Sequence, residues 1–237
     1  MTRRRWIADE VSANCAAVIG SHADHLVRVL RARIGQEFDI AAKETVRRGR
    51  ITSIQDHRVE FELGEVVSAA ERLEITLALA IYKFDRMEWA IEKCTELGVA
   101  RIVPVIAHRT DKHLASAAVK RVERWQRIAR HASEQSRRTS PPEIALPVKL
   151  KEAVALEATA RILLAETENQ VTLKKALQDF PAGADFVLAV GPEGGWTDAE
   201  LRLFSEAGWI SVSLGDNILR AETAAIAAMA IVLAELR

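Results

Sequence analysis

The sequence predicts an α/β protein in two parts: a small β-barrel over residues 1–70 and, from residue 74, a domain with a parallel sheet. Short apolar segments separated by glycines predict the first part, and a regular alternation of strand and helix patterns predicts the second. The chain has 237 residues, of which 49% are hydrophobic and 28% are charged. This composition is typical of a globular protein and excludes disordered, collagenous and coiled-coil chains.

In the first part, four short segments have the character of strands and one segment has helical spacing. The helix is expected at residues 23–31, where Leu26, Val29 and Leu30 recur at positions i, i+3 and i+4. The strands are expected at residues 18–19, 38–40, 50–54 and 59–63. Short strands with glycines between them fit a small barrel.

From residue 74 onward, strands alternate with helices. Asp85 is expected to cap the first helix, and Pro104 is expected to end the second strand. Thr197, followed three residues later by Glu200, is a capping box that begins another helix. The strands are expected at residues 75–81, 101–105, 162–165, 186–190 and 210–214, and the helices at residues 85–97, 119–135, 171–177, 197–207 and 222–236. This order predicts a parallel sheet with helices on both faces.

Two cysteines, Cys15 and Cys94, exclude a disulfide scaffold and any paired-cysteine motif. Cys94 is expected to be a packed core thiol rather than a nucleophile, and the six histidines lack a recurrent ligand spacing, so no metal site is expected. The basic N-terminus lacks the apolar stretch of a signal peptide, and the longest apolar run, residues 224–234, is too short to span a bilayer. We therefore expect a soluble, cytoplasmic protein without a membrane partner.

The charges are unevenly distributed although the net charge is zero. Residues 1–50 carry ten basic and six acidic side chains, a net of +4, and residues 81–140 carry 13 basic and seven acidic side chains, a net of +6. Two basic segments in a neutral chain predict a surface for a polyanion such as RNA, with an ordinary solvated surface as the alternative. The second segment includes a basic helix stripe formed by Lys120, Arg124, Arg127 and His131.

Residues 190–196, with the sequence VGPEGGW, follow a buried strand and precede the capped helix. Ligands of open α/β sheets bind beyond the carboxyl ends of strands, and glycines let the backbone approach a ligand closely. The glycine spacing matches neither a dinucleotide fingerprint nor a P-loop, which disfavours a Rossmann dehydrogenase. A ligand-binding loop and a simple tight turn both remain open.

Residues 213–224, with the sequence SLGDNILRAETA, also follow a strand and begin a helix. Ile218 and Leu219 are apolar residues in a loop, and they need a cover such as an adenine ring. Arg220 precedes a helix N-terminus, where a positive charge gains nothing from the helix dipole. We expect either a substrate as its partner or a brace to Glu193 or Glu222.

These two loops resemble the ribosomal RNA small subunit methyltransferase E family of SPOUT-class enzymes. Further segments resemble the family in the same order: HLVRVLR at residues 25–31, KFDRMEW at 83–89, EKCTELGV at 92–99, and RW, EQS and PPEI within 124–144. Departures from the family pattern are few. The triplet His108-Arg109-Thr110 stands where an acidic residue, Arg, and Ser or Cys are common, which leaves the role of Arg109 open, and Ala221 stands where Thr is common.

The resemblance implies a PUA-like RNA-binding β-barrel over residues 1–70 and a SPOUT methyltransferase domain, an α/β domain with a trefoil knot, over residues 74–237. It also implies a homodimer through the knot region. The implied reaction is methyl transfer from S-adenosylmethionine to N3 of a uridine in 16S rRNA of the small ribosomal subunit, giving 3-methyluridine (m3U1498 type). A non-catalytic rRNA-binding protein of the same fold is the alternative.

The expected catalytic residue is Arg220, which would donate to a uracil carbonyl oxygen as N3 loses its proton. No general base is evident, and Glu193 is expected to be a buried brace rather than that base. The cofactor is expected to contact Leu164, Glu166, Gly191, Glu193, Gly195, Leu214, Gly215, Ile218 and Leu219. The RNA is expected to contact Arg3, Arg4, Arg5, Arg28, Arg31, Arg124, Arg127 and Arg138.

Overall fold

The computed structural model describes residues 5–42, 45–69, 74–181 and 183–236, and the chain forms two compact units. The first unit comprises Met1–Glu71 and Ser133–Pro141, and the second comprises Arg72–Ala132 and Pro142–Arg237. The division near residue 71 lies where the composition changes. The segment Ser133–Pro141 lies beyond residue 74, within the range predicted for the second part, but it clusters with the first unit.

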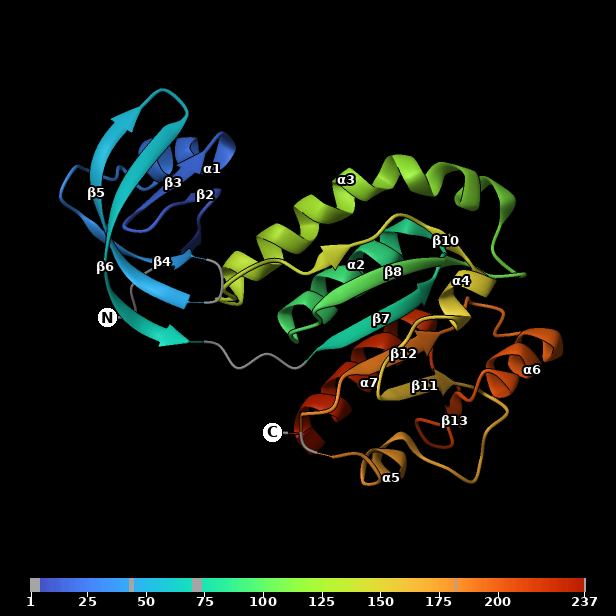
Figure 1. Cartoon of the computed structure of the whole chain (residues 1–237). Coiled ribbons are helices and arrows are strands. Elements are labelled where there is room, and N and C mark those ends of the chain that lie inside the picture. The colour runs from blue at the N-terminus through green and yellow to red at the C-terminus, as the bar shows by residue number, and fades with distance from the viewer. Residues whose placement is uncertain (1–4, 43–44, 70–73, 182, 237) are drawn as a thin grey trace. The chain divides into compact units, whose positions relative to one another are not determined.

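The first unit contains a six-stranded sheet with the order β1-β4-β5-β6-β3-β2. Its strands are β1 (Arg5–Ile7), β2 (Glu10–Val11), β3 (Cys15–Ile19), β4 (Glu37–Ala42), β5 (Thr45–Gln55) and β6 (Arg58–Ala69). The pairs are antiparallel except for β1 with β4, and β5 and β6 form a long hairpin (Figure 1). In the described part of this sheet, β1 and β2 are edge strands, so a closed PUA-like barrel stays a prediction.

A short helix with an irregular end interrupts the strands of the first unit. Helix α1 (Ser21–Asp24) continues into the π-helical turn η1 (His25–Val29), where a single regular helix was expected. The amide of Leu30 donates to the carbonyl of His25 at 3.1 Å, which is the wider hydrogen bond of a π-turn. Arg31 follows with a φ of 52°, and this left-handed residue ends the helical path.

The second unit is built on a parallel sheet with the order β10-β8-β7-β12-β11-β13, and β9 also pairs with β8. Its strands are β7 (Ile75–Ala80), β8 (Arg101–Ile106), β9 (Glu143–Ile144), β10 (Val148–Lys149), β11 (Ala160–Leu164), β12 (Phe186–Val190) and β13 (Ile210–Val212). All the pairings are parallel (Figure 1), which confirms the predicted parallel sheet.

Helices cover both faces of this sheet, as predicted. They are α2 (Phe84–Glu96), α3 (Lys112–Gln135), α4 (Leu150–Val154), α5 (Leu173–Leu177), α6 (Asp198–Glu206) and α7 (Ala221–Leu236). Leu77 and Leu79 of β7 pack in one core with α2, α3, α5 and α7, whereas Ala78 and Ala80 pack in another core with α4 and α6. Successive side chains therefore enter opposite cores, as the strand period requires. Within the described ranges, no helix is both long and apolar enough to cross a bilayer.

The helix caps were predicted with mixed success. The capping box of α6 is confirmed: the Glu200 amide donates to the Thr197 hydroxyl, and the Thr197 amide donates to the Glu200 carboxylate at 2.8 Å. The prediction that Asp85 caps α2 is wrong, because Lys83 is the N-cap residue. Asp85 lies in the first turn, where its negative charge still favours the helix dipole.

Several strand and helix boundaries also differ from the prediction, and two of them have a clear physical cause. Strand β8 continues through Pro104, which lies between the residues paired with β9 and those paired with β10. The missing N–H of the proline therefore interrupts no pairing on that side. Helix α3 begins at Lys112, well before the expected residue 119, because the Asp111 carboxylate accepts the amide of His113 at 2.7 Å and satisfies the first turn.

Candidate functional site

The carboxyl ends of β11, β12 and β13 meet at one edge of the parallel sheet. The loops that follow these strands line a cavity of about 320 Å³, and the first turns of α7 complete its wall. This is the edge at which open α/β sheets bind ligands. The volume fits a small-molecule site, for which roughly 300–1,000 Å³ is usual.

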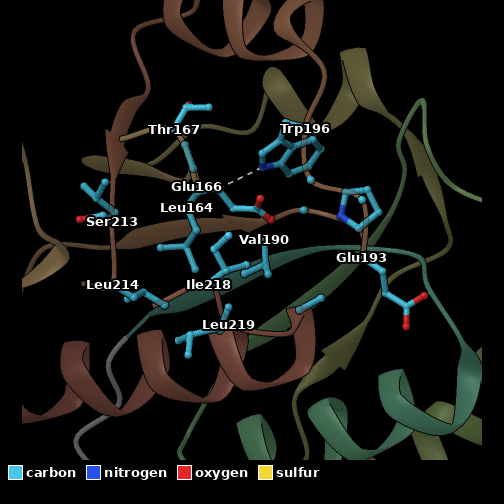
Figure 2. A pocket seen from close by; sticks show the side chains of 18 of the residues that line it. Leu164, Glu166, Thr167, Val190, Glu193, Trp196, Ser213, Leu214, Ile218 and Leu219 are labelled. Atoms are coloured by element: carbon cyan, nitrogen blue, oxygen red, sulfur yellow. Dashed lines mark hydrogen bonds between the residues drawn. The ribbon is translucent and has the colours of Figure 1, made fainter. Parts of the chain in front are cut away.

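All nine residues predicted to contact the cofactor line this cavity. They are Leu164, Glu166, Gly191, Glu193, Gly195, Leu214, Gly215, Ile218 and Leu219. In Figure 2, the side chains of Leu164, Leu214, Ile218 and Leu219 gather into one apolar group. Their convergence is a property of the fold, whereas their role in binding a cofactor stays a prediction.

Trp196 joins two of the three loops. Its Nε1 donates to the carbonyl of Leu164 at 3.1 Å, the dashed line in Figure 2. Gly191 packs against the same indole, because a Cβ atom at that position would lie 3.1 Å from Nε1. The VGPEGGW pattern alone does not predict this role for Trp196.

Gly195 is required both by the backbone and by the available space. Its φ is 69°, and a Cβ atom would lie 3.3 Å from Oε1 of Glu166. The Gly195 amide also donates to the carbonyl of Pro192 at 2.8 Å, which closes a tight turn. The two interpretations of this loop are therefore compatible, since it is a tight turn and it lines the cavity.

Arg220, the expected catalytic residue, lies just before α7 and beside the lining residues rather than among them. Its side chain is exposed, and its guanidinium has no hydrogen bond or ion pair with any residue that the structure describes. The brace that was the alternative role of Arg220 exists, but a different arginine forms it. Nη1 of Arg86, on α2, lies 3.3 Å from Oε1 of Glu222 and 3.7 Å from Oε1 of Glu193.

The brace corrects the expectation for Glu193. This residue was expected to be buried, but its side chain is 40% exposed, and Figure 2 shows its carboxylate directed away from the apolar group. The other carboxylate of the brace is buried: Glu222 is 3% exposed. Oε2 of Glu222 is buried without a hydrogen-bond partner among the described residues, as is the hydroxyl of Tyr82.

Tyr82 lies near the carboxylates of this brace in the core, and Cys94 lies near Tyr82. Burial, together with the nearby Cys94 and Glu222, raises the pKa of Tyr82 well above its ordinary value, so the phenol stays neutral. Burial also raises the pKa of Cys94 to about 12. A protonated, fully buried thiol is not a nucleophile, and the expectation of a packed core thiol is confirmed.

Arg109 lies at the rim of the same cavity, on the turn between β8 and α3. Its Nη1 donates to the carbonyl of Gly194, in the glycine loop. One signal in the sequence points to this residue, an arginine three positions after a parallel strand, but its role stays open from the sequence alone. The structure brings it to the three loops from a segment far away in the sequence.

In the first unit, the arginines that are expected to contact RNA have different surroundings. Arg3 and Arg4 lie outside the described residues. Arg5 is half-buried in β1, its pKa is lowered by burial, and it donates to the carbonyl of Arg137. Arg28 and Arg31 are exposed, with Nε of Arg28 lying 3.7 Å from Asp24.

The remaining RNA candidates lie on or after helix α3. Arg124 forms a bidentate pair with Glu88, with Nε at 2.7 Å and Nη2 at 2.9 Å, and this pair raises the pKa of Arg124. A paired guanidinium is less available to RNA than the exposed side chain of Arg127. Arg138 is half-buried and clusters with the first unit. The RNA contacts all stay predictions.

Comparison with known proteins shows which family has this sequence and fold. Residues 69–233 match the RNA methyltransferase domain family. The ribosomal RNA small subunit methyltransferase E of Synechocystis sp. is 37% identical over 212 residues, which cover 87% of this chain and 68% of that protein. The chain belongs to the ribosomal RNA small subunit methyltransferase E family. The resemblance carried by the two loops is thereby confirmed.

Solved structures of similar proteins extend over almost the whole chain. The ribosomal RNA small subunit methyltransferase E of Neisseria gonorrhoeae, bound to S-adenosyl methionine, is 31% identical with a TM-score of 0.82, and the match covers 97% of this chain and 96% of that one. A putative methyltransferase from Legionella pneumophila in complex with the bound cofactor SAM is 30% identical with a TM-score of 0.84, covering 99% and 98%.

Proposed function

We propose that this chain transfers a methyl group from S-adenosylmethionine to N3 of a uridine in 16S rRNA of the small ribosomal subunit, forming 3-methyluridine. The observation that carries the proposal is the convergence of three loops, from separate parts of the second unit, on one cavity. Relatives named as small subunit rRNA methyltransferases support rRNA as the substrate, and the SAM-bound structures support the cofactor.

The residues of the cavity fit S-adenosylmethionine, which supplies an electrophilic sulfonium methyl group when it is bound. Ile218 is 81% exposed, and with Leu164 and Leu219 it offers an apolar surface that an adenine ring would cover. The Glu166 carboxylate can accept hydrogen bonds from ribose hydroxyls or from an ammonium group. Gly195 leaves the backbone open to close approach.

Arg220 is the proposed catalytic residue. N3 of uracil must lose a proton to become nucleophilic, and the negative charge then spreads to the neighbouring carbonyl oxygens. A guanidinium that donates to one of these oxygens stabilises that charge. The side chain of Arg220 is exposed and unpaired in the described chain, and because Arg86 already braces Glu222, Arg220 is not needed for that task.

Glu193 is proposed as a brace rather than a general base. Its carboxylate lies 3.7 Å from Nη1 of Arg86, so it takes part in the ion pairs that join α2 to this loop. Its direction away from the apolar group supports the same role (Figure 2). We assign none of these residues as the general base of the reaction.

The proposal extends to fold details, partners and location. We propose a trefoil knot in the second unit, a PUA-like fold for the first, a homodimer through the knot region, and a cytoplasmic location. The alanine-rich sequence of α7 supports close approach of a second copy. We also keep the proposal that 16S rRNA contacts Arg3, Arg4, Arg5, Arg28, Arg31, Arg124, Arg127 and Arg138.

Calorimetric titration with S-adenosylmethionine, followed by single-turnover transfer of a labelled methyl group to unmodified small subunits, tests the proposal. We expect saturable cofactor binding and one methyl group transferred per subunit. Binding of ribosomal RNA without cofactor binding, or without transfer, would instead support the non-catalytic rRNA-binding alternative.

A further inference from the structure

The cavity is lined by acidic side chains although its proposed substrate is a polyanion. Four carboxylates line it, those of Glu166, Glu193, Asp198 and Asp216, and the single cationic side chain among the described lining residues is that of Arg109. An acidic lining favours a cationic sulfonium cofactor and repels phosphates and carbonyl oxygens that carry negative charge. A nucleotide that reaches the cavity therefore needs a cationic contact at the rim.

The two residues that flank Arg109 are anchored to buried groups, one through its backbone and one through its side chain. The amide of His108 donates to Oε1 of Glu200 at 2.7 Å, and Glu200 is 3% exposed. The hydroxyl of Thr110 donates to the carbonyl of Ile81 at 3.2 Å. The side chain of Arg109 is exposed. A fixed backbone with an exposed guanidinium is the arrangement expected of a residue preorganised for a ligand.

The hydrogen-bonding capacity and the charge of this guanidinium are mostly unused. One of its five N–H groups donates to the neutral carbonyl of Gly194. Arg86 and Arg124 are paired with carboxylates at 3.3 Å and 2.7 Å, whereas Arg109 forms no ion pair within the described ranges. Its guanidinium is therefore not held by a carboxylate, although it lies at the rim of a cavity whose other charged side chains are acidic.

We propose that Arg109 binds an oxygen of the target nucleotide at the rim of the cavity while it holds the glycine loop through Gly194. This inference rests on the proposed function and deepens it. The acceptor is an oxygen with negative charge, either a phosphate oxygen of the target strand or a uracil carbonyl oxygen as N3 loses its proton. Arg109 is then a substrate-recognising residue distinct from Arg220, which lies beside the lining residues.

The test compares the wild type with Arg109→Ala and Arg109→Lys, and uses Arg202→Ala as a matched control. Arg202 is an exposed arginine of α6 that does not line the cavity. For each protein we would measure the melting temperature, the affinity for unmodified small subunits over a range of salt concentrations, and the single-turnover rate. All the rates are taken at saturating S-adenosylmethionine, so that weaker cofactor binding does not lower them.

The two possible acceptors predict different results for Arg109→Ala. A phosphate contact predicts weaker subunit binding, with the slope of log affinity against log salt reduced by about 1, and partial recovery in Arg109→Lys. A carbonyl contact predicts a single-turnover rate about 10²–10³-fold lower at unchanged affinity, with little recovery in Arg109→Lys because the planar fork is lost.

Wild-type affinity, salt slope and rate in Arg109→Ala would overturn the inference, and so would a loss confined to the melting temperature. Equal losses in Arg109→Ala and Arg202→Ala would also overturn it, because the effect would then belong to general surface charge. Failure of the proposed function has a different signature, which is absence of methyl transfer by the wild type. The salt-slope comparison still tests a phosphate contact in that case, since it requires no chemistry.

Discussion

Gly195 shows at the scale of one residue how the cavity depends on the absence of a side chain. We expect Gly195→Val to lower the affinity for S-adenosylmethionine by at least about tenfold, because the new side chain would press on Glu166 and fill the space that the cofactor needs. Calorimetry measures the change.

Gly98→Val is the matched control for that substitution. Gly98 also has a positive φ, 95°, but nothing lies within 4 Å of its added Cβ atom, so the control carries backbone strain without an obstructed cavity. Both variants should melt at a lower temperature, and only Gly195→Val should lose cofactor affinity. Unchanged affinity in Gly195→Val would contradict the assignment of the loop.

Arg220 carries the second prediction at this scale. Loss of one preorganised donor typically slows chemistry about 10²–10³-fold, so Arg220→Ala should be a folded, cofactor-binding and slow enzyme. Arg220→Lys should also be impaired, because it keeps the charge but loses the planar fork. A single-turnover assay beside a melting curve checks both variants. Near-normal turnover, or slow turnover explained by unfolding, would end the catalytic assignment.

Three elements are joined by the brace: Arg86 on α2, Glu193 after β12 and Glu222 in the first turn of α7. Arg86→Ala would leave the buried carboxylate of Glu222 without its cationic partner, and an unsatisfied buried group costs about 1–3 kcal/mol. We therefore expect lower thermal stability, measured by a melting curve.

A double-substitution comparison separates this effect from loss of packing. Glu222→Gln removes the buried charge, so Arg86→Ala should cost less stability in the Glu222→Gln background than in the wild type. Equal costs in the two backgrounds would show that Arg86 contributes only packing and that no brace operates.

At the same scale, the elements show what the sequence could and could not predict. Most strands of the second unit and the Thr197–Glu200 capping box were predictable because their signals are local, although several strand ends differ by one or two residues. The brace was not, because its members come from three distant segments and an ion pair has no sequence period. Strands β9 and β10 were missed because two residues are too few for an alternating pattern, and the π-turn at His25–Val29 replaced a helix that has the same apolar spacing.

In the whole molecule, the RNA surface is predicted to draw on basic residues of both units. Arg28 and Arg31 are exposed in the first unit, and the variant with both changed to alanine should bind small subunits more weakly and with a shallower salt dependence, by about 1 per lost phosphate contact. Cofactor affinity should be unchanged. Filter binding over a salt series checks this, with Arg202→Ala as the control, and an unaltered slope would remove these residues from the RNA surface.

The division into units also decides how that surface can be tested. The sequence predicted a simple boundary after residue 70, and removal of residues 1–70 would follow as the natural experiment. Because Ser133–Pro141 clusters with the first unit, such a truncation would strip this segment of its packing partners. Point substitutions are therefore the cleaner test. Sequence patterns could not show this arrangement, because the segment begins within the last turn of a long amphipathic helix and carries no boundary signal.

The central claim is that this chain methylates N3 of a uridine in 16S rRNA. Mass mapping of 16S rRNA from otherwise identical cells with and without the protein tests it most directly, with Gly195→Val as a complementing variant that should fail to restore the modification. We expect one 3-methyluridine that is present with the wild-type protein and absent without it. Identical modification maps, or a methyl group lost from a different base or atom, would show that the chain does not catalyse this reaction.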